Sequence, residues 1–206
     1  MPLFKELKDN NSSIFIWEVS ESETDLSEGL NDLITLRIMQ NNKLKKRRIE
    51  KYVQAYLLRQ ANIDPLSVSY SPSGKPFIES NHLHISFSHS GKFAALIVSN
   101  TVCGIDIEKE NQKIEKISPK FLNEVERNFL HIPGALTWIW CIKEAVFKYF
   151  GEQVSFKDDI IIDRFDQKLL TAQVSYKGFH GNGKFEIKLD RFENYYLAYT
   201  KEFRHI

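Results

Sequence analysis

The sequence has few cysteines and no excess of charge of either sign. Cys103 and Cys141 are the two cysteines among 206 residues, which excludes a disulfide-built scaffold and a structural zinc site. Lysine and arginine number 28 and aspartate and glutamate 27, so the formal net charge is +1. Broad nucleic-acid binding normally needs a basic excess, and we therefore expect no nucleic-acid partner.

Long apolar segments are missing as well. No run of about 18 apolar residues occurs, so no membrane span and no membrane partner are expected. The opening residues, MPLFKELKDNN, are polar and lack the apolar centre of a signal peptide. We therefore expect a cytoplasmic protein.

What the sequence does contain is the balance of an ordinary globular protein, with 42% apolar and 27% charged residues. Apolar periodicity predicts helices at residues 25–39, 44–62, 118–130 and 135–150. A strand is predicted at residues 14–19 and hairpins at residues 82–100 and 184–201. Long helices beside antiparallel hairpins indicate an α+β fold. The order of long helix, turns and hairpin occurs twice, and we place the two halves at residues 1–100 and 101–206.

The most informative stretch is GIDIE at residues 104–108. Alternate side chains of a strand share a face, so Asp106 and Glu108 lie on one side and Ile105 and Ile107 on the other. Two carboxylates at that spacing repel each other unless a cation or a proton lies between them. The alternative is a half-exposed edge strand with a polar face.

The last predicted helix is apolar in nearly every direction and should be largely buried. Charges on such a helix are rarely tolerated unless they are paired or bind a ligand. Two interpretations stay open. Glu144 forms a salt bridge with Lys148, or it joins Asp106 and Glu108 around a hard cation such as Mg²⁺, with Lys143 and Lys148 facing the anions of the substrate.

Four motifs in order make the sequence resemble a known family. GIDIE at residues 104–108 and WCIKEAVFK at residues 140–148 match the patterns G-x-D-x-E and W-x-x-K-E-x-x-x-K of the 4′-phosphopantetheinyl transferase superfamily. SFSHS at residues 86–90 and GKP at residues 74–76 are similar to two further motifs of its long, monomeric Sfp-type branch. The resemblance covers about half of the chain.

The resemblance implies a pseudo-dimer of two similar halves, each a long helix packed on a small antiparallel sheet, with the active site at their junction. Residues 1–100 would supply the side that binds the coenzyme A phosphates, and residues 101–206 the metal-binding carboxylates and the catalytic helix. The implied reaction transfers the 4′-phosphopantetheine group of coenzyme A to a serine hydroxyl of an acyl or peptidyl carrier protein and releases adenosine 3′,5′-bisphosphate. It would need Mg²⁺, with Mn²⁺ as the alternative, and the protein would be a monomer.

The resemblance also assigns site residues by motif position. The implied metal ligands are Asp106, Glu108 and Glu144. The implied catalytic residues are Glu126 as general base, Lys148 and Glu144. The residues implied to bind the coenzyme A phosphates are Arg47, Arg48, Lys75, Ser88, His89, Lys143 and Lys148. Ala55 stands where some members carry a further arginine, and Glu126 has the alternative of an ordinary solvent-facing helix glutamate.

Two other functions stay open. A Mg²⁺-dependent hydrolase of a nucleotide or pyrophosphate would use the same carboxylates and lysines. A non-catalytic module that binds coenzyme A or a carrier protein would not require Asp106, Glu108, Glu144 and Lys148 together.

Overall fold

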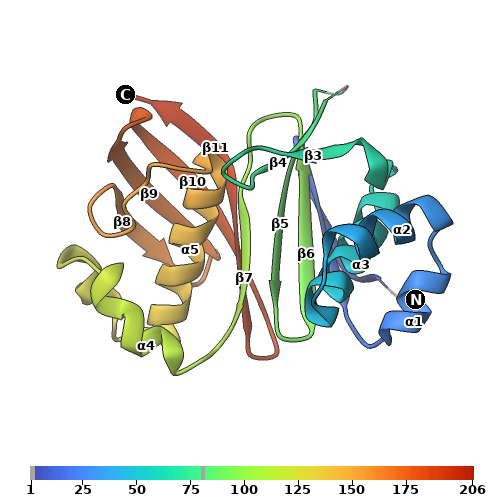
Figure 1. The fold of residues 1–206 in the computed structure, drawn as a ribbon. Helices are drawn as coiled ribbons and strands as arrows, with labels where there is room; N and C mark the ends of the chain where they lie inside the picture. Colours follow the sequence, from blue (N-terminus) through green and yellow to red (C-terminus); the bar gives the residue numbers. More distant parts are fainter. Residues whose placement is uncertain (1–2, 80–81) are drawn as a thin grey trace.

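The computed structural model describes residues 3–79 and 82–206 and shows two antiparallel sheets side by side, each covered by helices (Figure 1). The first sheet has the strand order β1-β2-β6-β5 and the second the order β7-β11-β10-β9-β8. Helices set against antiparallel sheets confirm the predicted α+β class. None of the helices in the described residues is long and apolar enough to span a bilayer.

The N-terminal half holds the first sheet and three helices. Its sheet strands are β1 (Leu3–Lys8), β2 (Ser12–Glu18), β5 (His84–Ser90) and β6 (Phe93–Ser99). Its helices are α1 (Glu23–Glu28), α2 (Asp32–Asn41) and α3 (Lys45–Gln60). A 3-10 turn, η1 (Pro65–Ser67), leads into the short pair β3 (Val68–Tyr70) and β4 (Pro76–Ile78).

The C-terminal half holds the second sheet and the long helix α5 (Ala135–Phe150). Its strands are β7 (Ile105–Lys109), β8 (Ile160–Asp166), β9 (Thr171–Gly178), β10 (Gly181–Phe192) and β11 (Tyr195–His205). Between β7 and α5 lie one short α-helix, α4 (Lys113–Ile117), and two 3-10 helices, η2 (Ser118–Lys120) and η3 (Val125–Phe129). Gly151 caps the C-terminal end of α5 with the left-handed φ of 94°.

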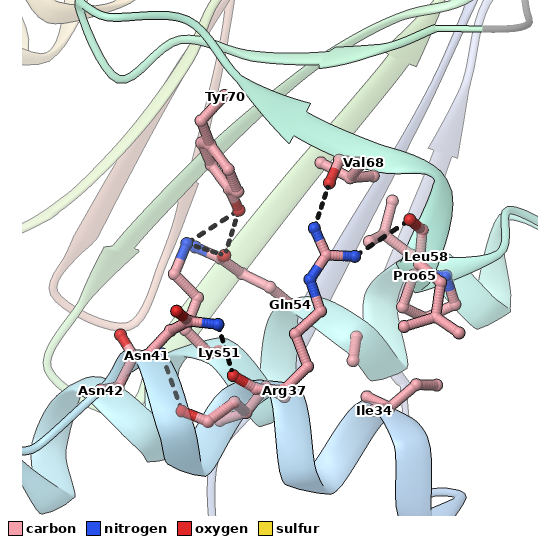
Figure 2. A pocket seen from close by; sticks show the side chains of 13 residues that line it. Ile34, Arg37, Asn41, Asn42, Lys51, Gln54, Leu58, Pro65, Val68 and Tyr70 are labelled. Atoms are coloured by element: carbon pink, nitrogen blue, oxygen red, sulfur yellow. Dashed lines mark hydrogen bonds between the residues drawn. The ribbon is translucent and has the colours of Figure 1, made fainter.

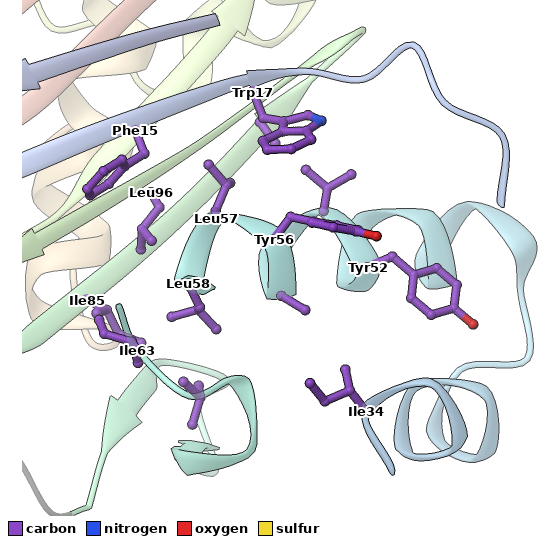
Figure 3. Packing of buried hydrophobic residues seen from close by; sticks show 14 of the residues in the cluster. Phe15, Trp17, Ile34, Tyr52, Tyr56, Leu57, Leu58, Ile63, Ile85 and Leu96 are labelled. Atoms are coloured by element: carbon purple, nitrogen blue, oxygen red, sulfur yellow. The ribbon is translucent and has the colours of Figure 1, made fainter. Parts of the chain in front are cut away.

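Three apolar cores hold these layers together. In the first, helices α1 to α3 cover one face of the first sheet, and Trp17 stacks on Tyr56 with ring centroids 5.5 Å apart (Figure 3). In the second, α5 covers one face of the second sheet. The third lies between the two sheets, where Ile14 and Ile16 of the first pack with Ile105 and Ile107 of the second. The apolar face predicted for the GIDIE strand is therefore the face that joins the halves.

Two predicted helices are wrong in extent. The helix at residues 25–39 is split into α1 and α2, because Gly29 ends the first and the Asn31 side chain caps the second by accepting from the Ile34 N–H. The helix at residues 118–130 is replaced by η2 and η3. Asn123 interrupts the predicted helix there, because its side chain accepts a hydrogen bond from the Glu126 N–H.

Both halves share one topological feature. The strand that precedes the long helix pairs with the last strand of the half, β2 with β6 and β7 with β11. The sheets differ in strand number, four against five. The pseudo-dimeric relation and the division at residue 100 stay predictions.

Gly104 lets α5 pack against the start of β7. A Cβ at this position would lie 2.0 Å from the Ala145 carbonyl oxygen and 2.7 Å from the Tyr149 nitrogen, which are both backbone atoms of α5. The backbone that approaches this glycine closely is thus that of the helix, which brings the charged residues of α5 over the β7 carboxylates.

We expect Gly104→Ala to lower the free energy of unfolding by about 1–3 kcal/mol, because α5 must move away from β7 to admit the methyl group. Urea denaturation followed by circular dichroism measures the change. An unchanged midpoint would show that the contact between the helix and Gly104 is not tight.

Candidate active site

The candidate site lies where β5 and β7, the edge strands of the two sheets, run next to each other (Figure 1). Asp106 and Glu108 of β7 point away from the apolar layer that holds Ile105 and Ile107. Helix α5 packs on the same strand and contributes Glu144 and Lys148. The fold therefore gathers the two charged motifs of the sequence at the junction of the halves.

Asp106 is the most enclosed of the three carboxylates at the site, with a side chain 3% exposed. Its Oδ1 accepts from Lys148 Nζ at 2.6 Å and from Ser88 Oγ at 2.7 Å. Its Oδ2 is buried and has no hydrogen-bond partner in residues 3–79 and 82–206. Burial alone would lower the pKa of Lys148, but the charges of Asp106 and Glu144 outweigh burial and raise it.

Glu108 is held at both oxygens. Oε1 accepts from Trp140 Nε1 at 3.2 Å and Oε2 from Ser90 Oγ at 3.0 Å. Burial and then the negative charge of Asp106 raise the pKa of Glu108, against the two hydrogen bonds and Lys148. Repulsion between the two β7 carboxylates, as predicted from their spacing, is present in the fold.

Glu144 is half-buried one helical turn before Lys148. Burial, followed by the charge of Asp106 and more weakly of Glu108, raises the pKa of Glu144 to about 7. Lys148 donates to Asp106 at 2.6 Å, so the alternative of a simple salt bridge between Glu144 and Lys148 does not describe the site. The three carboxylates act on one another electrostatically.

These residues fit a hard divalent cation by their donor chemistry. A free buried oxygen on Asp106 and a repelled carboxylate on Glu144 are groups that a cation would stabilise, and carboxylates are the ligands Mg²⁺ prefers. As they stand, no three acidic, histidine or cysteine side chains of the described chain meet closely enough to form a metal centre. Lys148 Nζ contacts Asp106 Oδ1, one of the carboxylate oxygens available to a metal.

Lys143 and Glu126 do not lie in the site. Both side chains are fully buried, and Lys143 Nζ lies 2.8 Å from Glu126 Oε1. Lys143 also donates to the carbonyls of Phe121, Phe156 and Ile160, at 2.7–2.8 Å. A charge on an inward-facing helix position must find partners inside, so the structure corrects the prediction that Lys143 faces substrate phosphates.

The general-base role of Glu126 is corrected for the same reason. Its Oε1 also accepts from the Ile162 N–H at 3.0 Å, and its Oε2 accepts from the Asn123 N–H at 3.1 Å. Every oxygen thus has a buried partner, and the carboxylate is closed off from a substrate hydroxyl in this conformation. It is not a solvent-facing glutamate either.

Two of the predicted phosphate ligands are committed to other contacts. Arg48 Nε lies 2.5 Å from Glu23 Oε1 and its Nη1 donates to the Asn42 and Lys43 carbonyls, which ties α1 to the start of α3. Ser88 is buried, and its hydroxyl donates to Asp106. Arg47 is 65% exposed and pairs with Glu50 on its own helix.

His89 and Lys75 lie at the borders of the site. His89 Nε2 is 2.8 Å from Glu50 Oε1, which joins β5 to α3. Burial lowers the pKa of His89; Glu50 opposes this shift, and the positive charges of Lys148 and Lys46 add to it. Lys75 donates to the Tyr149 carbonyl near the end of α5, and burial lowers the pKa of Lys75.

A cavity of about 220 Å³ opens between the halves next to these residues. Three lysines line it, one from α3, one from the turn before β4 and one from α5: Lys51, Lys75 and Lys148. Lys148 also contacts Asp106 and thereby links the wall of the cavity to the carboxylates. Its cationic walls suit an anionic ligand.

A second cavity, of about 370 Å³, lies between α2, α3 and the η1–β3 segment (Figure 2). Lys51 donates to Tyr70 Oη at 2.7 Å and to Gln54 Oε1 at 3.0 Å, and these residues also line the first cavity. Ala55, at the position of the family's further arginine, lines the second cavity. None of the predicted site residues does.

Three site residues were not assigned from the sequence: Lys51, which lines the cavity, and Ser90 and Trp140, which both donate to Glu108. The alternation of serines at positions 86, 88 and 90 is the signal that could have identified Ser90. In a strand it places three hydroxyls on one side.

We expect Glu126→Ala to lower the free energy of unfolding by about 3–5 kcal/mol, because Lys143 would keep a buried charge without its counter-ion. Urea denaturation measures the loss. Glu124→Ala is the control, since Glu124 is 86% exposed and pairs with Arg127 on the surface, where such pairs contribute about 0–1 kcal/mol. Equal losses in the two variants would contradict a structural role for the buried pair.

Glu144 generates a pH-dependent prediction. Between its ordinary value of 4.5 and about 7, the folded protein holds a proton that the unfolded chain releases, so the stability associated with Glu144 falls as pH rises through this window. Glu144→Gln, which stays neutral, should therefore be more stable than the wild type at pH 8, by about 1–3 kcal/mol, but not at pH 4. Urea titrations with a chelator present test this, and the same difference at both pH values would contradict it.

Comparison with known proteins agrees with this geometry. The family model described as 4′-phosphopantetheinyl transferase superfamily matches residues 102–200, which contain β7 and α5. A curated relative, the 4′-phosphopantetheinyl transferase gsp of Aneurinibacillus migulanus, is 29% identical over 111 residues, which cover 50% of this chain and 46% of that protein. The chain thus matches about half the length of the relative. The resemblance that the motifs predict is confirmed for residues 102–200, which match the model of the 4′-phosphopantetheinyl transferase superfamily.

Proposed function

We propose that the protein transfers the 4′-phosphopantetheine group of coenzyme A to a serine hydroxyl of an acyl or peptidyl carrier protein. The proposal rests on the family match and on one contact, that of Lys148 with Asp106. This contact joins a cavity lined by lysines to a group of crowded carboxylates. A substrate that carries several phosphates, and reacts at one of them, needs cationic side chains and metal-binding oxygens side by side.

The lysines would bind the substrate. Lys51 and Lys75 line the cavity from the N-terminal half and Lys148 from the C-terminal half, so the phosphates of coenzyme A would lie between the halves. Lys148 reaches the carboxylates and would neutralise the negative charge that grows on the leaving adenosine 3′,5′-bisphosphate. His89, with Lys46 and Arg47 near it, would contribute to the same positive region.

The carboxylates would hold the metal. We assign Mg²⁺, with Mn²⁺ as the alternative, to Asp106, Glu108 and Glu144. Asp106 would bind it through its free Oδ2. When bound, the metal supplies positive charge at the pyrophosphate. Lys148 would then share Asp106 with it, or turn its ammonium toward the substrate.

In the reaction, a bond forms between the serine oxygen and the phosphorus of the phosphopantetheine, and the phosphoanhydride bond to the bisphosphate breaks. The serine must lose its proton as it attacks. Glu126 is enclosed by Lys143 and Glu144 is assigned to the metal, so the proton would pass to solvent water. Fixed geometry and charge neutralisation supply the rest of the catalysis.

Incubation with coenzyme A, Mg²⁺ and an apo carrier protein tests the proposal, with mass spectrometry of the carrier as the measurement. We expect the carrier to gain phosphopantetheine, and Glu144→Ala to slow the gain on the order of 100-fold or more. Glu152→Ala, an exposed carboxylate just after α5, is the matched control and should transfer normally.

A Glu144→Ala protein with near-normal turnover, and with the circular dichroism spectrum of the wild type, would refute the three-carboxylate site. Cleavage of a nucleotide in the absence of any carrier protein would instead favour the hydrolase alternative.

A further inference from the structure

Three serines of β5 face the edge of β7 and bond to its backbone. Each hydroxyl accepts a hydrogen bond from a β7 N–H: Ser86 from Ile105 at 3.3 Å, Ser88 from Ile107 at 3.2 Å and Ser90 from Lys109 at 3.0 Å. Edge strands carry N–H groups that need acceptors. Side-chain hydroxyls supply them here, in place of the carbonyls of a neighbouring strand.

Two of the three hydroxyls make a second bond. Ser88 donates to Asp106 Oδ1 at 2.7 Å and Ser90 donates to Glu108 Oε2 at 3.0 Å. A serine hydroxyl has one proton to donate, and a backbone N–H approaches its oxygen from the β7 side. The proton of each hydroxyl is therefore directed to a carboxylate, and hydroxyl and carboxylate are fixed together.

These bonds determine which carboxylate oxygens stay free. Ser88 and Lys148 both take Oδ1 of Asp106, so Oδ2 is the oxygen without a partner. Ser90 and Trp140 hold the two oxygens of Glu108 and thereby set the plane of its carboxylate. The orientation of both groups depends on β5, although both belong to β7.

We propose that Ser88 and Ser90 are positioning residues, which orient Asp106 and Glu108 for a divalent cation, and that Ser86 only joins the strands. This inference rests on the proposed function insofar as that function assigns a cation to Asp106 and Glu108. Partners that hold ligating carboxylates in place typically change metal affinity 10–100-fold when they are removed.

The test uses the full-length protein and Mn²⁺ alone, with the free ion measured by electron paramagnetic resonance. Ser88→Ala and Ser90→Ala should each weaken Mn²⁺ binding about 10–100-fold. Ser86→Ala is the matched control, because it loses the same kind of backbone bond but touches no carboxylate in the described chain, and its Mn²⁺ affinity should equal that of the wild type. Ser90→Thr, which keeps the hydroxyl at a half-buried position, should restore the affinity.

Measuring stability beside Mn²⁺ affinity distinguishes serines that orient a carboxylate from a serine that only joins β5 to β7. All three alanine variants leave a β7 N–H without its acceptor, so each should lower the free energy of unfolding, and only Ser88→Ala and Ser90→Ala should also lower the Mn²⁺ affinity. If Ser88→Ala does not fold, the comparison of Mn²⁺ affinity between Ser90→Ala, Ser90→Thr and Ser86→Ala still tests the proposal.

Equal Mn²⁺ affinities in the Ser86, Ser88 and Ser90 variants would overturn the proposal, as would a wild-type protein that binds no Mn²⁺. The assay contains no coenzyme A and no carrier protein. A failure of phosphopantetheine transfer can therefore be told apart from a failure of the positioning role.

Discussion

The structure depends on the way that β5 and β7 meet. They are edge strands of different sheets, and the hydroxyls of Ser86, Ser88 and Ser90 take the place of a backbone ladder between them. Behind this line the apolar faces of the two sheets form a shared core, and in front of it the β7 carboxylates meet the charged residues of α5. Joining the two halves and building the site are therefore the same event.

The pair formed by Glu126 and Lys143 shows how a charged motif can have a structural rather than a chemical use. Breaking such a fully buried pair leaves an uncompensated charge inside the protein, which lowers the free energy of unfolding. Lys143 binds carbonyls of the chain before α5 and of the chain after it, at Phe121 and Ile160. It thus holds α5 between these segments and keeps the next residue, Glu144, directed at β7.

Much of this could be predicted from the sequence, because it depends on local periodicity. The alternation of apolar and acidic residues correctly predicted that Ile105 and Ile107 face an apolar layer and Asp106 the opposite side. The continuous apolar surface of the last helix correctly predicted the bounds of α5. Helix breaks at Asn31 and Asn123 were missed, since a side chain that caps a backbone N–H overrides an apolar stripe.

The roles of single charged residues were harder to predict. A lysine at a buried helix position looks the same in sequence whether it meets a substrate or a glutamate. Glu126, the partner of Lys143, lies in the segment that was wrongly predicted to be a helix. Glu23, the partner of Arg48, lies in α1, before the break that separates α1 from α2. In the described chain no strand is shared between the sheets, and the connection from Ser99 to Ile105 links them. Cutting that connection would leave every backbone ladder of the described strands whole, and the two pieces would then be held together only by the apolar core between the sheets and by side-chain contacts such as those of β5 with β7 and of α5.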